Sequence, residues 1–352
     1  MFGRKSVPLL GVDISTSSIK MVELSKSGER YSVEAYAAEA TPEGAVTDKQ
    51  ITDPEQVADA IRRALKRSGA KAKQAVAAIS GQHAVSKVVQ MPANLGEREL
   101  EGQIIMQADQ YIPFDMEEVS FDWEVQGENP NDPEMVDVLL VATKSENVES
   151  RQVALELAGL NCKIIDVERY ALENSVRMVT HQLPDEGLDH TIAICDFGAT
   201  TTTFSVLHDL NIAYSRDLSF GGRQLTEEIM RAYGLTLEEA GRAKKEGGLP
   251  SNFEPEILAS FIQDMAQQVN RSLNYYQTAG SAQPNPELLV ICGGCAKIAG
   301  VADQIADQVG IPSVIAEPLG KAKISSKAKA AGVEKDDVAL MIAFGLALRS
   351  FN

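Results

Sequence analysis

The chain carries the same strand–turn–strand pattern twice, once near its start and once just past its middle. The copies cover residues 11–24 and 192–207. Each consists of an apolar strand ending in aspartate, a turn of small hydroxyl residues or glycine, and a second apolar strand. Backbone N–H groups and hydroxyls at such a turn can bind phosphate oxygens. The aspartates, Asp13 and Asp196, supply the hard oxygen ligands that an accompanying Mg²⁺ prefers. Two such turns, facing each other across a cleft, predict a nucleotide site.

Length and charge restrict the class of protein. With 352 residues the chain exceeds the size at which single cores usually stop growing, so we expect two lobes. The net charge of −17 disfavours a nucleic-acid surface or direct adhesion to anionic lipid. No segment approaches the roughly 18–20 apolar residues that cross a bilayer, and residues 1–8 lack the pattern of a signal peptide. We expect a cytoplasmic protein that binds no nucleic acid and does not insert into a membrane.

The four cysteines fit a reducing compartment. Cys162 and Cys195 lie in apolar runs and are expected to be small buried hydrophobes. The segment 292–295, Cys-Gly-Gly-Cys, has the spacing of half a metal site or of a redox pair, but no second cysteine pair accompanies it. Alternatively, the apolar run ending at Cys292 delivers a strand into two glycines. Their lack of a Cβ lets backbone lie flat against a ligand, and in a nucleotide site this would hold adenine and ribose.

Hydrophobic periodicity and turn residues predict the order of the elements. In the first part we expect a hairpin at 9–24, strands at 29–38 and 74–80, and a helix starting at Asp53-Pro54. The next part has the order β-α-β-β-α-β of a ferredoxin-like insertion: 85–91, 97–112, 119–125, 136–142, 148–158 and 163–167, with a turn at 127–134. The last part has a second hairpin at 191–207 and strands at 210–219, 288–292 and 313–315. Its helices are expected at 225–233, 237–246, 254–279, 302–309 and 338–349.

This order resembles that of the actin, Hsp70 and sugar-kinase superfamily. The insertion looks like the subdomain found in the cell-division protein FtsA. Within the superfamily the chain most resembles the PilM family, the actin-like proteins of type IV pilus assembly. The resemblance covers essentially the whole chain and rests on residues 10–24, 108–114, 165–172, 247–250 and 292–297, of which the segment Ala-Asp-Gln-Tyr-Ile-Pro-Phe at 108–114 is the most specific. It implies a two-lobed α/β ATPase fold with an FtsA-like, ferredoxin-like inserted subdomain.

The resemblance also implies a division into four parts. The first-lobe core, subdomain IA, would comprise 1–84, completed by about 166–184 and 336–352. The inserted subdomain IC would be 85–165. The second-lobe core, subdomain IIA, would comprise 185–225 and 275–335, and subdomain IIB would be 226–274.

The resemblance further implies roles for individual residues in binding ATP and Mg²⁺. The first phosphate loop would be formed by Asp13, Ser15, Thr16, Ser17 and Lys20. The second would be formed by Asp196, Gly198, Ala199, Thr200 and Thr201. Asp13 and Asp196 would hold Mg²⁺ through water. Adenine and ribose would be contacted by Gly222, Lys244, Gly293, Gly294, Ala296 and Lys297.

Two positions leave alternatives open. Glu168 stands where related proteins orient the attacking water, which would make it the catalytic residue. An acidic residue at that place also fits the first turn of a helix. In the segment 238–244, Gly241 and Arg242 occupy places where relatives carry acids, whereas Lys244 matches the family pattern. The contact of this segment with adenine is therefore expected, whereas its contact with ribose stays open.

By resemblance, the protein is an ATP-binding scaffold of the type IV pilus inner-membrane complex, and so serves twitching motility, with slow ATPase activity at most. Its partner would be the cytoplasmic N-terminal peptide of PilN, from the PilN/PilO subcomplex, docked in a groove between the first subdomain and the insertion. Tyr111, Pro113 and Phe114 would either line that groove or belong to the core. This binding would hold the protein peripherally at the inner membrane. Contacts with pilus motor or platform proteins stay open.

Three other functions compete with this one. An FtsA-like filament former would need a C-terminal amphipathic anchor, and we expect none because the sequence ends at 348–352, directly after its closing helix. A small-molecule kinase would need an acceptor site with an aligned base, and the sequence shows no recognisable one. A degenerate relative would bind no nucleotide. The sequence does not show the oligomeric state or what hydrolysis would drive.

Overall fold

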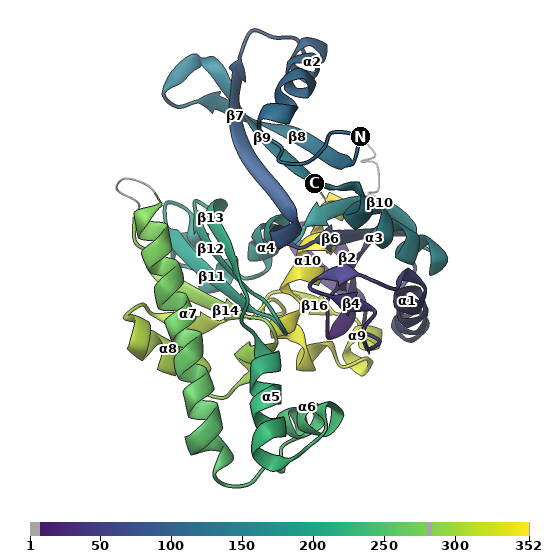
Figure 1. The fold of residues 1–352 in the computed structure, drawn as a ribbon, viewed down its shortest axis with the longest axis vertical. Helices are drawn as coiled ribbons and strands as arrows, with labels where there is room; N and C mark the ends of the chain where they lie inside the picture. Colours follow the sequence, from purple (N-terminus) through teal and green to yellow (C-terminus); the bar gives the residue numbers. More distant parts are fainter. Residues whose placement is uncertain (1–7, 280–283, 352) are drawn as a thin grey trace.

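Two lobes, each built on a β-sheet, make up most of the molecule (Figure 1). The computed structural model describes residues 8–279 and 284–351. Residues 1–7, to which most of the signal-peptide prediction applies, lie outside that description. A smaller sheet projects from the first lobe, and the chain both enters and leaves this sheet through the first lobe (Figure 1).

The first lobe contains a six-stranded sheet. Its strands are β1 (Leu9–Ile14), β2 (Ser18–Ser27), β3 (Arg30–Ala40), β6 (Gln74–Ile79), β10 (Asn161–Val167) and β16 (Lys323–Ile324). They lie in the order β10-β6-β1-β2-β3-β16, in which β1 and β2 form the first predicted hairpin. The helix α1 (Pro54–Ser68) begins where the sequence predicts, because the side chain of Asp53 accepts the backbone N–H of Gln56.

The second lobe contains a five-stranded sheet of similar plan. Its strands are β11 (Thr191–Phe197), β12 (Thr202–His208), β13 (Asn211–Leu218), β14 (Leu288–Cys292) and β15 (Ser313–Ile315), in the order β13-β12-β11-β14-β15. Its helices are α5 (Gly222–Tyr233), α6 (Leu237–Glu246), α7 (Ala259–Thr278) and α8 (Val301–Val309). The second predicted hairpin is β11–β12. The predicted helix 254–279 is α7 preceded by a π-helical turn at Glu254–Leu258.

The inserted unit has a sheet of three strands, not the four of a ferredoxin-like unit. These are β7 (Ala84–Pro92), β8 (Val119–Asn129) and β9 (Asp132–Lys144), in the order β7-β9-β8, with α2 (Glu97–Gln107) packed on one face. The turn predicted at 127–134 is shorter, because β8 and β9 extend to Asn129 and Asp132. The Asn129 side chain there accepts the backbone N–H groups of Asn131 and Asp132.

The last two elements predicted for the insertion belong to the first lobe instead. The strand β10 pairs in parallel with β6, and the helix α3 (Ser145–Leu157) contacts α1. The apolar side chains of Ala154 and Leu155 lie in the first-lobe core, and Cys162 packs against it. Burial of these side chains in the first-lobe core removes their apolar surface from water, which favours this placement.

Two helices lie between the lobes and hold them together (Figure 1). They are α4 (Glu168–Ser175) and α10 (Met341–Leu348), and every residue of α10 is buried. Their backbones approach so closely that a Cβ on Gly345 would overlap the backbone oxygen of Ala171. The final apolar helix was predicted from its composition, whereas its crossing with α4 depends on this one glycine.

We predict that Gly345→Ala lowers the free energy of unfolding by at least about 1–3 kcal/mol, because the added methyl group meets backbone that cannot rotate away. Urea unfolding followed by circular dichroism measures the change. The matched control is Gly102→Ala in α2, where an added Cβ meets nothing within 4 Å. It should be neutral or stabilising, since alanine favours helix. Equal losses in both variants would contradict the packing argument.

Candidate functional site

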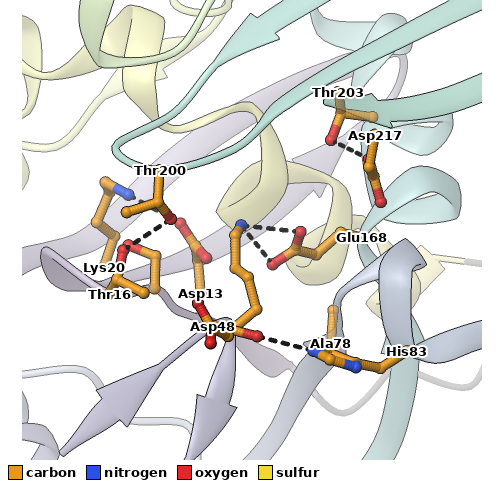
Figure 2. A network of polar contacts seen from close by, with 12 residues as sticks. Asp13, Thr16, Lys20, Asp48, Ala78, His83, Glu168, Thr200, Thr203 and Asp217 are labelled. Carbon is orange, nitrogen blue, oxygen red and sulfur yellow. Dashed lines mark hydrogen bonds and ion pairs between the residues drawn. The ribbon is translucent and has the colours of Figure 1, made fainter. Parts of the chain in front are cut away.

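The turns of the two predicted hairpins meet where the lobes face each other (Figure 2). The hydroxyl oxygens of Thr16, in the β1–β2 turn, and Thr200, in the β11–β12 turn, lie 3.4 Å apart. Ser15, in the same turn as Thr16, donates its hydroxyl to the backbone oxygen of Ser18, which closes that turn, and Ser17 is exposed. The structure thus brings both predicted loops to one place, although they are far apart in the sequence.

A carboxylate lies at the base of each turn. Asp13 is opposite Lys20 in the β1–β2 ladder, and the two form an ion pair of 2.9 Å with little exposure to solvent. Asp196 is partly exposed, and the protein packed around it raises its pKa to about 6. Lys49 and Lys20 lower that pKa, whereas the nearby carboxylates of Asp13 and Glu168 raise it. The carboxylate oxygens of Asp13 and Asp196 are ligands of the kind that a hydrated Mg²⁺ prefers.

The charged side chains of Asp13, Lys20, Asp196 and Glu168 form a cluster. Lys49 also belongs to it and was not predicted from the sequence. It belongs to the two-residue turn of a short hairpin, β4 (Val46–Thr47) and β5 (Gln50–Ile51), and both Asp48 and Lys49 have positive φ there. Its ammonium lies 3.0 Å from each carboxylate oxygen of Glu168, and both side chains are nearly buried. A two-residue polar turn between apolar residues, with Asp first, is the signal that could have revealed it.

The electrostatics of this pair follow from its surroundings. Burial favours the neutral form of Lys49, but the carboxylates of Glu168, Asp13 and Asp196 outweigh it and raise the pKa of the ammonium. Lys49 therefore stays charged and partly neutralises three acidic groups. Glu168 lies in the first turn of α4, where an acidic residue is favoured, and it also lies among the charged side chains of the site. Its position is therefore compatible with both roles that the sequence left open.

The second phosphate loop packs on the start of α5. The backbone N–H of Gly222 donates to the oxygen of Gly198 at 3.0 Å, and that of Arg223 donates to Ala199 at 2.7 Å. A Cβ on Gly221 would overlap backbone atoms of Ala199, so this contact requires glycine. At the other end of the loop, the backbone oxygen of Thr201 accepts the N–H of Gly198.

Lys244 is brought to the same helix start, but its ammonium is already engaged. It donates to the backbone oxygen of Gly222 at 2.7 Å and to the hydroxyl of Thr226 at 2.6 Å. Arg242 lies on another face of α6, in the wall of a separate hollow of about 420 Å³ with Tyr233 and the loop 247–250. The structure therefore brings Lys244 to the start of α5 and leaves Arg242 away from it.

The glycine pair after β14 approaches the second aspartate. Gly293 has φ +85°, and a Cβ there would overlap the carboxylate of Asp196. Gly294 and Ala296 follow in a 3-10 turn, and Lys297 at its end forms a 2.6 Å ion pair with Asp336. The backbone at Gly293 thus lies against the aspartate, while Lys297 reaches toward a different residue.

The cysteines form no metal centre in the described part of the chain. Cys195, Cys292 and Cys295 are buried and free, and burial raises the pKa of the Cys295 thiol to about 11. No group of three or more histidine, cysteine or acidic side chains placed to hold a metal occurs among residues 8–279 and 284–351. Over the same residues, no helix has the length and apolar character needed to span a membrane.

A groove separates the inserted unit from the first lobe. It has a volume of about 310 Å³, and its walls come from β8, β9, α3 and β10. Half-buried apolar side chains line it: Phe121, Val141, Val148, Cys162, Ile164 and Ile165. The strand β10 is at the edge of its sheet, so its outer backbone groups face away from β6. Tyr111 and Phe114 instead pack on the core of the inserted unit, and Pro113 is exposed.

We predict that, without nucleotide and above pH 6, Asp196→Asn is more stable than the wild type by up to about 2 kcal/mol, a figure that already allows for solvent screening. With its pKa raised to about 6, the folded protein holds a proton between pH 4 and 6 that the unfolded chain releases, so stability falls as pH rises through that window. Thermal unfolding at pH 4, 5, 6 and 7 measures the difference between variant and wild type. This difference should be largest at pH 7 and vanish near pH 4. The exposed control Asp264→Asn should show no such trend.

Comparisons with known proteins identify the family. The family described as type IV pilus assembly protein PilM matches residues 11–351. A chain of the PilM–PilN type IV pilus biogenesis complex is 25% identical, with 99% of each chain covered and a TM-score of 0.81. The ethanolamine utilization protein EutJ from Carboxydothermus hydrogenoformans is 17% identical, with coverage of 97% of this chain and 89% of EutJ and a TM-score of 0.58. MreB5 of Spiroplasma citri bound to AMPPNP is 14% identical, with coverage of 97% and 95% and a TM-score of 0.51.

These similarities confirm the predicted actin-like fold. The family match covers nearly the whole chain, including both hairpins, the inserted unit and the helices between the lobes. The chain belongs to the PilM family of type IV pilus assembly proteins.

Proposed function

We propose that this actin-like protein is a scaffold of the pilus inner-membrane complex that binds Mg-ATP between its lobes and the N-terminal cytoplasmic peptide of PilN in its groove. The observation that carries the first part is the meeting of Thr16 and Thr200 above a cluster of charged side chains. The groove beside β10 carries the second.

Nucleotide binding is supported by the composition of the cluster. Hydroxyls and backbone N–H groups of the two turns would hold the phosphates, and Lys20 and Lys49 would offset part of their charge. Asp13 and Asp196 would hold Mg²⁺ through water, and the metal would neutralise charge between the phosphates. MreB5, which shares the fold, was solved with AMPPNP bound.

The same cluster favours slow hydrolysis at most. Both carboxylate oxygens of Glu168 accept from Lys49, so the carboxylate is not free to orient an attacking water while this ion pair exists. Lys49 would have to move toward the nucleotide before Glu168 could do so. Glu168 is therefore proposed as the catalytic group of a weak ATPase that works only when this ion pair opens.

The base and ribose would lie between α5, α6 and the turn after β14. Gly222, Gly293 and Gly294 would allow close approach of the backbone. Lys244 supports the helix start by its hydrogen bonds and would meet the nucleotide from there. The sheet arrangement supports retaining the four proposed subdomains, with α3 and β10 counted with the first lobe.

PilN binding is proposed from the groove and from the complex in which a similar chain was solved. An extended or short helical peptide could seat apolar side chains in the groove and meet the free edge of β10. Such binding would keep a protein with an acidic surface at the inner membrane without direct contact with lipid.

We expect Mg-ATP at 100 times its Kd to stabilise the wild type by about 2.7 kcal/mol, because ligand binds only the folded state. Asp13→Asn should lose most of this gain, since it removes a charge that would bind hydrated Mg²⁺. Thermal-shift titration with Mg-ATP measures both. The control is Asp59→Asn on the exposed face of α1. If Mg-ATP stabilised Asp13→Asn as much as the wild type, Asp13 would not take part in nucleotide binding.

We expect Val148→Glu to weaken binding of a PilN peptide at least about tenfold, because the new charge would be buried against an apolar ligand. Titration of a fluorescent peptide by anisotropy measures the affinity. Val153→Glu is the matched control, since Val153 is exposed on the same helix and lies outside the groove wall. If both variants bound the peptide equally well, the groove would not be its site.

A further inference from the structure

One helix forms a wall of the groove and also holds the turn that carries Lys49. On α3, Val148 and Gln152 line the groove. Asn147 and Arg151, on the same helix, make hydrogen bonds to the β4–β5 hairpin. The proposed peptide site and the proposed nucleotide site therefore share α3.

Arg151 is the centre of these contacts. It is 1% exposed, and its guanidinium donates to three backbone oxygens. These belong to Ala78 at the end of β6 at 2.6 Å, Asn147 in α3 at 3.0 Å and Lys49 in the turn at 2.7 Å. The planar guanidinium presents its donors at fixed angles, so these three contacts fix the turn relative to the sheet and to α3.

A second set of contacts joins the turn to the base of the inserted unit. The imidazole of His83 lies 2.7 Å from the backbone oxygen of Asp48 (Figure 2). The hydroxyl of Thr143, which also lines the groove, donates to the backbone oxygen of His83 at 2.7 Å. The same hydroxyl accepts from the amide of Asn147 at 3.1 Å, and Gln50 of β5 donates to Asn147 at 3.3 Å.

Positive φ at both turn residues makes this support necessary. Asp48 and Lys49 have φ of 49° and 65°, values that residues other than glycine rarely adopt. The turn keeps this conformation because its backbone oxygens are held from α3 and from His83. The position of the Lys49 ammonium against Glu168 depends on that conformation.

We propose that Arg151 is a positioning residue for the Lys49–Glu168 pair, and that through it a peptide in the groove and a nucleotide in the cleft alter each other's affinity. The inference rests on the proposed function. The two states are Lys49 paired with Glu168, as in this structure, and Lys49 turned to the terminal phosphate of a bound triphosphate. A peptide that shifts α3 or Thr143 biases the turn between them. Thermodynamic linkage makes the effect reciprocal.

The test compares a triphosphate with a diphosphate, because only the former has the phosphate that Lys49 would reach. Affinities for Mg-AMPPNP and Mg-ADP are measured by calorimetry, with and without saturating PilN peptide. In the wild type the peptide should change the ratio of the two affinities by roughly fivefold or more. In Arg151→Lys this change should fall below twofold, since one ammonium cannot span three carbonyl oxygens.

Thr143→Val is the second variant, because it keeps the shape of the side chain and removes the hydroxyl that joins His83 to Asn147. It should also reduce the change in ratio while the protein keeps its melting temperature within a few degrees. The control Arg62→Lys, exposed on α1, should leave the change intact. A ratio of affinities within one variant does not respond to global destabilisation, so a merely structural role would leave it unmoved.

The outcomes separate the two proposals. A wild type that binds neither nucleotide nor peptide overturns the proposed function, and the coupling with it. A wild type that binds both while the peptide changes the ratio less than twofold overturns the coupling alone. An undiminished change in both Arg151→Lys and Thr143→Val overturns the assignment of Arg151. Reduced change in both variants, with the control intact, supports it.

Discussion

Three carboxylates converge where the lobes meet, and the rest of the site depends on how their repulsion is offset. The carboxylates of Asp13 and Glu168 lie close enough to Asp196 to raise its pKa, whereas two ammonium groups, Lys49 and Lys20, lower it. Lys20 comes from the strand paired with Asp13, so the first hairpin partly neutralises itself. In the second hairpin Asp196 is opposite Thr203, and burial keeps the pKa of the aspartate raised. A divalent cation would relieve that imbalance, which is a physical reason for metal-dependent binding at this place.

Close backbone approach is the second condition for the site. Gly293 permits the strand β14 to turn against Asp196, and Gly221 permits the second phosphate loop to lie on the start of α5. Gly345 permits the two helices between the lobes to cross. In each case a methyl group would overlap backbone, which cannot rotate away as a side chain can. The strands, turns and helices that carry the carboxylates are therefore held in place by contacts between main chains.

The sequence predicts the hairpins and the long helices because local signals determine them. Apolar runs that reach an aspartate before a turn of small residues mark β1–β2 and β11–β12, and the cap at Asp53 marks α1. Pairing between distant strands leaves no such signal, which is why β10 was expected in the insertion although it pairs with β6. Lys49 was missed for a related reason. Its hairpin is only two residues on each side, and its importance arises from contacts with Glu168, 119 positions away.

The placement of β10 and α3 in the first lobe has a consequence for function. Had both elements belonged to the insertion, the groove would lie within one small unit with a separate core, apart from the lobe that carries Asp13. Because they belong to the first lobe, one wall of the groove is continuous with the sheet that carries Asp13. The opposite wall, from β8 and β9, belongs to the insertion. A ligand in the groove therefore contacts both bodies at once, and any movement of one against the other is transmitted to α3 and to the sheet behind it.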